Sequence, residues 1–375
     1  MKRIYLDNAA TTPMLPEVVE CMAESMLQNF GNPSSTHQFG RTAKSAVETT
    51  RKQIAKYFNV HSSEIVFTSG GTEGDNIVLQ NAVINLGVTR IVTTKLEHHA
   101  VLHTVDFLEE KYGVEVVYLE VDQKGCYQIE ALEEVLNASD KKTLVTLMWV
   151  NNELGNIAPV KEIAEVCQRH AALFHSDSVQ AIGHVPIDLQ EVKVDFMVAS
   201  AHKFHGPKGV GFLYVRKGHV VKPMLHGGDQ ERGVRSSTEN VHGIIGMGRA
   251  LEVSLNVLNE EMARLNELKS YFISSLKTKV PGVLFNGESE NLRNSSPTIV
   301  SVRFPLENPM MLFNLDIKGI AVSGGSACQS GSSKGSHVLQ ACLPDVEAAK
   351  TSIRFSFSKL TTKDDVETAL EAVVG

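Results

Sequence analysis

The sequence lacks the features that mark several classes of protein. Its cysteines are scattered, with no Cys-x-x-Cys spacing, so the pattern suggests neither a zinc site nor a disulfide framework. No run of lysine and arginine is longer than a pair, and the formal net charge of -7 argues against direct nucleic-acid binding. No stretch approaches the roughly 20 apolar residues of a membrane span, and the N-terminus has no apolar leader. The cysteine count is odd, so we expect a cytoplasmic protein with reduced thiols; the five are Cys21, Cys126, Cys167, Cys328 and Cys342.

The apolar segments alternate with helical patterns in the first two thirds of the chain. With 375 residues, the chain is long enough for one large and one small domain. In residues 160–167, apolar side chains recur with the period of a helix that has one buried face. Strands that are apolar throughout and separated by helices indicate a mainly parallel α/β sheet. We predict seven strands, at residues 64–69, 90–95, 114–120, 143–150, 172–177, 194–200 and 209–216.

The pattern changes near residue 250. A long helical stretch covers residues 248–279, and two shorter strands are expected at 297–304 and 352–358. We therefore predict a large domain of residues 15–250, and a smaller α/β domain that combines residues 1–14 with residues 251–375.

The segment SAHKFHGPKG, residues 200–209, places Lys203 directly after a predicted buried strand. A lysine in a surface turn is usually solvated, whereas a cation at the mouth of a buried strand needs a partner. The rest of the chain has to decide between these two interpretations.

Two further segments carry polar groups at strand ends. FTSGGTEGDN, residues 67–76, predicts a strand, a glycine turn and a helix start, whose free N–H groups suit a phosphate; a plain capped helix is the alternative. Asp177 ends another strand, where it pairs with a cation or caps a helix with Gln180 as its capping-box partner. His99 and His103 have i, i+4 spacing, but no third ligand accompanies them, so we predict no metal site.

Cys328 lies in VSGGSACQSGSSKGSH, residues 322–337. Such a run of small residues buries a thiol poorly, so Cys328 is a candidate nucleophile, with a spectator cysteine as the alternative. A phosphate turn, a strand-end aspartate, a strand-end lysine and a candidate stacking histidine together match the needs of pyridoxal phosphate. That cofactor binds a lysine covalently and keeps its ring nitrogen charged beside a carboxylate.

Nine motifs along nearly the whole chain give it a family resemblance. The sequence resembles the cysteine desulfurases of the nitrogen-fixation and iron–sulfur housekeeping branch. This resemblance implies the pyridoxal-phosphate-dependent transferase fold of type I. The motifs are YLDNAATTP, GNPSSTH, TSGGTEGDN, EHHAV, VNNELG, SDSVQAIG, SAHKFHGPKG, GGDQERGVRSSTEN and SGGSACQSG.

The resemblance also implies roles for individual residues. Lys203 is then the lysine that binds the cofactor, and Asp177 and Gln180 contact its ring nitrogen and its phenolic oxygen. His98 stacks on the ring and carries protons. Asn152 and Arg354 bind the substrate carboxylate. The expected phosphate ligands are Gly71, Thr72, Ser200 and His202, together with Thr238 of the neighbouring subunit.

By the same resemblance, L-cysteine is converted to L-alanine and the Cys328 thiolate accepts the sulfur as a persulfide. The expected partners are L-cysteine, sulfur-acceptor proteins of iron–sulfur assembly or tRNA thiolation, and a second copy of the chain. A selenocysteine lyase, another β-eliminating enzyme and an inactive assembly protein remain alternatives. Three residues depart from the family pattern: Asp229, Ser237 and Ser358, of which the last two replace an expected glycine.

Overall fold

The computed structural model describes residues 3–324 and 335–375. Its centre is a seven-stranded sheet in the order β2-β8-β7-β6-β5-β3-β4. All seven predicted strands are confirmed, and β8 alone in this sheet runs antiparallel to its two neighbours. The strands are β2 (Ile65–Thr68), β3 (Arg90–Thr93), β4 (Glu115–Tyr118), β5 (Thr143–Thr146), β6 (Leu173–Asp177), β7 (Phe196–Ser200) and β8 (Gly211–Val215).

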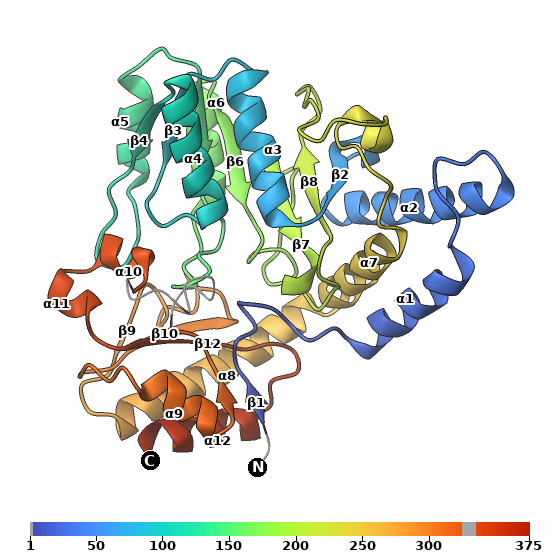
Figure 1. Cartoon of the computed structure of the whole chain (residues 1–375). Coiled ribbons are helices and arrows are strands. Elements are labelled where there is room, and N and C mark those ends of the chain that lie inside the picture. Colours follow the sequence, from blue (N-terminus) through green and yellow to red (C-terminus); the bar gives the residue numbers. More distant parts are fainter. Residues whose placement is uncertain (1–2, 325–334) are drawn as a thin grey trace.

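Helices cover both faces of this sheet (Figure 1). Neighbouring strand residues enter different cores: Ile91 packs with α3 and α4, and Val92 packs in the core that α2, α5, α6 and α7 share. Side chains alternate across a strand, so this split explains why the strands carry apolar residues on both faces. The helices are α1 (Pro16–Gln28), α2 (Gln38–Tyr57), α3 (Gly71–Ile84), α4 (His99–Tyr112), α5 (Ile129–Asn137), α6 (Val160–Arg169) and α7 (Val241–Asn256).

A second, smaller core lies below the large sheet in Figure 1. Ile4 and Leu6 pack in it beside residues of the C-terminal third, and β1 pairs with β11. The small part contains β1 (Ile4–Tyr5), α8 (Leu258–Lys279), β9 (Leu284–Phe285), β10 (Ile299–Arg303), α9 (Met311–Ile317), β11 (Ile320–Ala321), α10 (His337–Cys342), α11 (Asp345–Ala348), β12 (Ser352–Ser356) and α12 (Lys363–Val374).

The two cores support a division into a large and a small domain, whose bounds stay a prediction. The helical stretch expected at 248–279 is confirmed apart from one residue: Val257, with φ -118° and ψ 14°, separates α7 from α8. Leu251 in α7 faces the large core, whereas Leu265 and Phe272 in α8 face the small core. The two helices on either side of Val257 therefore pack in different cores. Within the described residues, no helix is long and apolar enough to span a membrane.

Candidate active site

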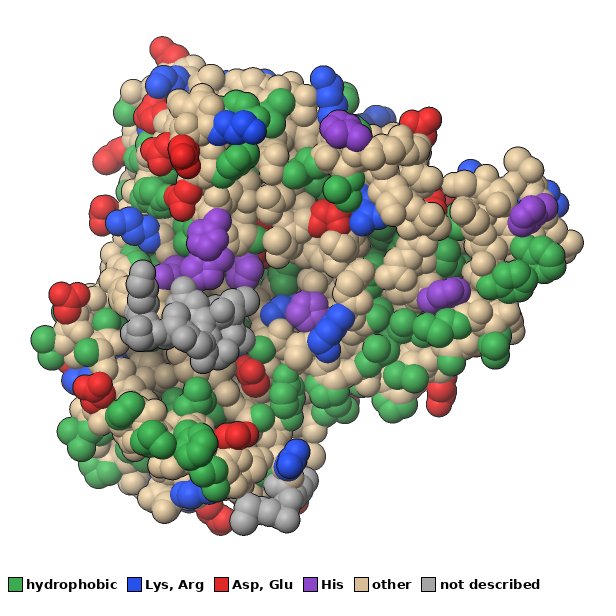
Figure 2. Space-filling model, in the orientation of Figure 1, with side chains coloured by type: hydrophobic (Ala, Val, Ile, Leu, Met, Phe, Trp, Pro, Cys, Tyr) green, Lys and Arg blue, Asp and Glu red, His purple; other side chains and the backbone are tan. Residues whose placement is uncertain are grey.

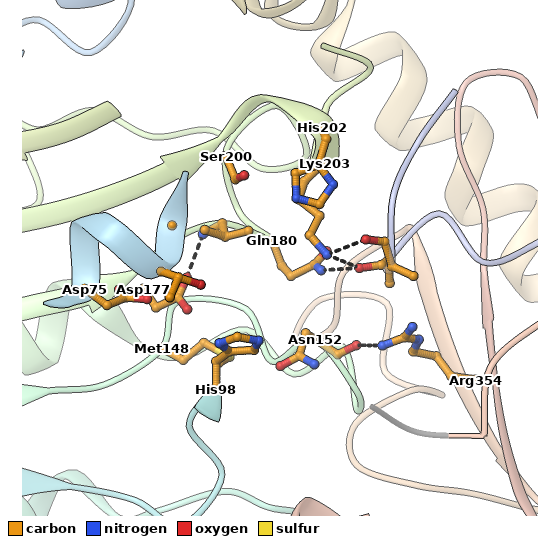
Figure 3. Close-up of a pocket in the computed structure, with 15 residues that line it drawn as sticks. Asp75, His98, Met148, Asn152, Asp177, Gln180, Ser200, His202, Lys203 and Arg354 are labelled. Carbon is orange, nitrogen blue, oxygen red and sulfur yellow. Dashed lines mark hydrogen bonds between the residues drawn. The ribbon is translucent and has the colours of Figure 1, made fainter. Parts of the chain in front are cut away.

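A cavity of about 250 Å³ opens where the large sheet meets the small part. The carboxyl ends of β6 and β7, the start of α3, the N-terminal segment and β12 all reach it. In an open α/β sheet, ligands bind beyond the carboxyl ends of the strands. The lining residues are Ala9, Ala10, Gly71, Thr72, Asp75, His98, Met148, Asn152, Asp177, Val179, Gln180, Ser200, His202, Lys203 and Arg354 (Figure 3).

The glycine turn before α3 forms one end of this cavity. Gly70 has φ 155°, a conformation that side-chain-bearing residues rarely adopt, and a Cβ on Gly71 would lie 2.6 Å from Val179 Cγ2. Gly71 and Thr72 begin the helix, so their N–H groups have no partner inside it. Ser200 lies beside the turn, 3.3 Å from where a Cβ on Gly70 would be. These donors fit a phosphate.

Lys203 points into the cavity from the 3-10 turn η2 (Ala201–Lys203), which follows β7. Its Nζ donates to Ala9 O at 2.6 Å and to Ala10 O at 2.8 Å. The preceding residue, His202, also lines the cavity, and its Nδ1 lies 3.1 Å from Thr11 Oγ1. Burial, with the nearby Lys203 and Lys208, lowers the pKa of His202 to about 4, so its ring is neutral at pH 7.

Asp177 ends β6 with its carboxyl group buried. Oδ1 accepts the Val179 N–H at 3.0 Å, and burial raises the pKa of the carboxyl against the lowering effect of His98 and Lys203. The capping-box interpretation is wrong, because Gln180 Nε2 donates to Ala9 O at 2.8 Å instead of returning to Asp177. A cationic ligand group would give this carboxylate a partner.

His98, Asn152 and Arg354 form the opposite side of the cavity (Figure 3). His98 caps α4, and its Nδ1 accepts the Ala100 N–H at 3.1 Å. Burial lowers its pKa, so the neutral ring carries its proton on Nε2. Arg354 Nη1 donates to Asn152 O at 2.7 Å and Nη2 donates to Asp7 Oδ1 at 3.0 Å. Arg354 Nε is buried without a hydrogen-bond partner among the described residues.

These residues fit pyridoxal phosphate. The glycine turn has room and N–H donors for the phosphate, Lys203 Nζ reaches the same cavity, and the buried Asp177 carboxylate suits a protonated ring nitrogen. The small part closes the cavity with Arg354, whose remaining N–H groups suit a carboxylate.

Of the other predicted site residues, one lies elsewhere and one is not described. Thr238 is exposed and does not line the cavity of its own chain. Cys328 lies outside the described residues. His99 lies 4.9 Å from His103 and 4.4 Å from His337, measured between ring centroids. Figure 2 shows a cluster of histidine side chains on this face of the molecule. No group of three metal-binding side chains occurs within residues 3–324 and 335–375.

The three departures from the family pattern have different structural consequences. Ser237 has φ 95°, which strains a residue with a side chain. Ser358 is buried, and its N–H donates to Thr361 Oγ1 at 2.9 Å, so this serine is accommodated. Asp229 precedes the short turn η3 (Gln230–Gly233), and its side chain makes no cap there.

Sequence reasoning missed several lining residues. Ala9 and Ala10 act through backbone carbonyls, which no side-chain pattern reveals. Asp7 lies 347 residues before Arg354 in the sequence, and its carboxylate accepts a hydrogen bond from Arg354 Nη2. Asp75 lies in a helix start, GTEGDN, that is polar almost throughout, so its carboxyl group gave no distinctive signal.

Comparisons with known proteins agree on one family. The family described as Aminotransferase class-V matches residues 4–369. A protein named "Cysteine desulfurase IscS" from Dictyoglomus turgidum is 43% identical over 377 residues, covering 100% of this chain and 94% of its own length. A solved structure titled "NIFS-LIKE PROTEIN" superposes with TM-score 0.91 at 37% identity, over 99% of this chain and 98% of its own. Another, "SspA in complex with cysteine", has TM-score 0.80 at 32% identity, over 94% of this chain and 98% of its own.

Proposed function

The chain belongs to the class-V aminotransferase family, and we propose that it is a pyridoxal-phosphate-dependent cysteine desulfurase. The observation that carries this proposal is the convergence of Lys203, Asp177 and Arg354 on one cavity beside the glycine turn. The relative from Dictyoglomus turgidum carries the name of this activity, and the SspA structure was solved with cysteine. The products are L-alanine and an enzyme-bound persulfide.

Arg354 and Asn152 bind the substrate carboxylate. Two of the five N–H groups of Arg354 are engaged by Asn152 O and Asp7 Oδ1, so three remain for an anionic ligand. The buried and unpaired Nε makes such a ligand favourable. Asp7 also holds the guanidinium in place, because its carboxylate opposes rotation of the planar group.

The cofactor, when bound, supplies an electron sink for a carbanion on the substrate. Lys203 Nζ is the base that takes the proton from the substrate Cα, since it is the lysine of the cavity lining. The carbonyls of Ala9 and Ala10 hold Nζ at this wall. His98 is neutral with a proton on Nε2, so it can donate that proton within the cavity.

Cys328 accepts the sulfur. Its thiolate attacks the substrate sulfur, the new S–S bond forms while the substrate Cβ–S bond breaks, and the electron pair remains on the carbon side. That carbon takes up a proton and leaves as alanine. The described residues on either side of the Cys328 segment support this role. On one side, Ser323 exchanges backbone hydrogen bonds with Arg354, which lines the cavity. On the other side, Ser336 Oγ donates to the Glu153 carboxylate.

The active form is a homodimer in which Thr238 reaches the phosphate of the neighbouring subunit. Thr238 is exposed, as a residue that serves another chain has to be. Exposed apolar side chains gather on the projecting α1 and α2 and on the segment between them (Figures 1 and 2). Leu27 on α1 is 81% exposed, and Phe30 in the connecting segment is 64% exposed and contacts Phe39 of α2 with ring centroids 5.1 Å apart. A second copy of the chain is the occupant that we propose for this apolar face.

The persulfide then passes to acceptor proteins of iron–sulfur assembly or tRNA thiolation. This chemistry requires reduced thiols, and the four described cysteines are all free, which supports action in the cytoplasm.

Replacing Lys203 by alanine tests this function, with the exposed Lys208→Ala as the matched control. Purified wild-type protein should show cofactor absorbance and form alanine from L-cysteine. Lys203→Ala should lower alanine formation at least about a hundredfold, the usual scale for a lost general base. Equal activity in the two variants would contradict the proposal, as would wild-type protein that forms no alanine with the cofactor added.

A further inference from the structure

Asp75 lies at the floor of the cavity with its carboxyl group almost completely buried. It is the fifth residue of α3, and 1% of its surface is exposed. Neither carboxyl oxygen has a hydrogen-bond partner among the described residues, although Asp75 lines the same cavity as Asp177 (Figure 3). A buried polar group of this kind needs an explanation.

His175 is the nearest complementary group. It lies two residues before Asp177 on β6, so both side chains point to the same face of the sheet. Its Nε2 is 3.4 Å from Asp75 Oδ1, and its Nδ1 is 2.9 Å from Thr146 Oγ1 on β5. His175 and Thr146 are both fully buried, so water does not compete for these contacts.

The charges around Asp75 disfavour its ionised form. Asp177 and the buried Glu97 add two further carboxyl groups nearby, and burial together with these two groups raises the pKa of Asp75 well above its ordinary value. The ammonium group of Lys203 lowers the pKa of Asp177 and is not among the groups that shift the pKa of Asp75. The N-terminal half of α3 favours an anion, but this effect fades beyond the first turn and is weaker than the cost of an unpaired buried charge.

A protonated, positively charged His175 is not supported either. Burial lowers the pKa of His175 to about 3. An ion pair at 3.4 Å with no further hydrogen bonds on the carboxylate does not offset the loss of hydration of both ions. The remaining arrangement is a neutral acid beside a neutral imidazole.

We propose that Asp75 is a positioning residue that stays protonated and donates its O–H to His175 Nε2, leaving Asp177 to face the cofactor ring nitrogen as a carboxylate. Of the proposed function, this proposal relies only on the binding of pyridoxal phosphate. His175 then carries its proton on Nδ1, which donates to Thr146 Oγ1, so a chain of three side chains fixes the tautomer. The electrostatic consequence is that a single negative charge, on Asp177, balances the ring cation.

Three variants of the holoenzyme test this arrangement. Asp75→Asn keeps a donor for His175, Asp75→Ala removes it, and Thr146→Val removes the acceptor for Nδ1–H while leaving Asp75 in place. Asp75→Ala should bind pyridoxal phosphate about tenfold more weakly than Asp75→Asn, the scale of one lost buried hydrogen bond. Equal affinities of Asp75→Ala and Asp75→Asn would overturn the proposal.

Two spectroscopic readouts detect the proton itself. Infrared difference spectra should lose one carboxylic-acid carbonyl band in Asp75→Asn, with Glu97→Gln as the matched control that leaves this band in place. Nitrogen NMR of labelled histidine should show His175 protonated on Nδ1 only, and Thr146→Val should disturb this tautomer. An unchanged carbonyl region in Asp75→Asn, or a proton on His175 Nε2, would overturn the proposal.

The pH dependence of the cofactor absorbance tests whether Asp75 is neutral or ionised in the holoenzyme. If Asp75 is neutral, Asp75→Asn leaves the midpoint of this titration in place. If Asp75 is ionised, its removal lowers the proton affinity of the ring nitrogen and moves the midpoint to lower pH, which would refute the proposal. Wild-type protein without cofactor absorbance would count against the proposed function instead, and the carbonyl band and the histidine signals still report on Asp75.

Discussion

Replacing Arg354 by lysine probes how the cavity holds a substrate carboxylate. The Arg354 side chain is 2% exposed, and its guanidinium already donates to Asn152 O and Asp7 Oδ1. A lysine ammonium has three N–H groups, and two of them are needed for the same two acceptors. At most one then remains for the substrate, whereas arginine offers two in a planar fork.

The lost contact is a hydrogen bond between charged groups, which contributes about 1.5–3 kcal/mol. Arg354→Lys should therefore lower kcat/KM for L-cysteine by about 10- to 150-fold. Arg303→Lys is the matched control: Arg303 lies on the adjacent strand β10, its side chain is mostly buried beside Glu347, and it does not line the cavity. This control should change kcat/KM by less than about threefold, the scale of a neutral substitution away from the site.

A substrate analogue makes the test specific. Cysteamine has the thiol and the amine of cysteine but no carboxylate, so its affinity should be nearly the same for wild type and Arg354→Lys. The affinity for L-cysteine should fall in the variant, as measured through the change in cofactor absorbance. An equal loss of affinity for both compounds would refute the carboxylate role of Arg354, and so would an unchanged kcat/KM for L-cysteine.

Two further predictions concern stability. Ser237→Gly should raise the free energy of unfolding by about 0.5–1 kcal/mol, because φ 95° costs a side-chain-bearing residue more than glycine loses in entropy; a lower melting temperature would contradict this. Burial lowers the pKa of Lys269 from its ordinary 10.5 to about 7. The unfolded chain therefore binds the proton between these two pH values while the folded chain does not, and the lysine penalty shrinks as pH rises. The stability gain of Lys269→Met over wild type should be about 2 kcal/mol smaller at pH 9 than at pH 7, and a pH-independent difference would contradict the burial of this amine.

The large sheet could be predicted from the sequence because its strands, apart from the half-buried β4, are buried on both faces. Short apolar runs such as FLYV in β8 indicate such buried strands, and glycine or polar residues mark their ends. The reversed direction of β8 carries no signal of this kind. The break at Val257 was also beyond prediction, because it depends on which of two cores each helix face meets.

The candidate site also contains residues that the sequence could predict and contacts that it could not. Lys203 and Asp177 were identified because ionisable groups at the ends of apolar strands are costly without a partner. The contacts of Lys203 with Ala9 O and Ala10 O use the backbone of residues almost 200 positions away, where alanine gives no chemical clue. Long-range contacts of this type depend on the three-dimensional fold.

The most direct test of the desulfurase proposal is the mass of the protein after reaction with L-cysteine in the absence of reductant. The proposal predicts alanine release and a mass gain of one sulfur atom, which peptide mapping assigns to Cys328 and which Cys328→Ala abolishes while Cys126→Ala retains it. Sulfide release with no adduct on the protein would contradict the persulfide route and favour a lyase. A sulfur adduct that maps to another cysteine would contradict the role of Cys328.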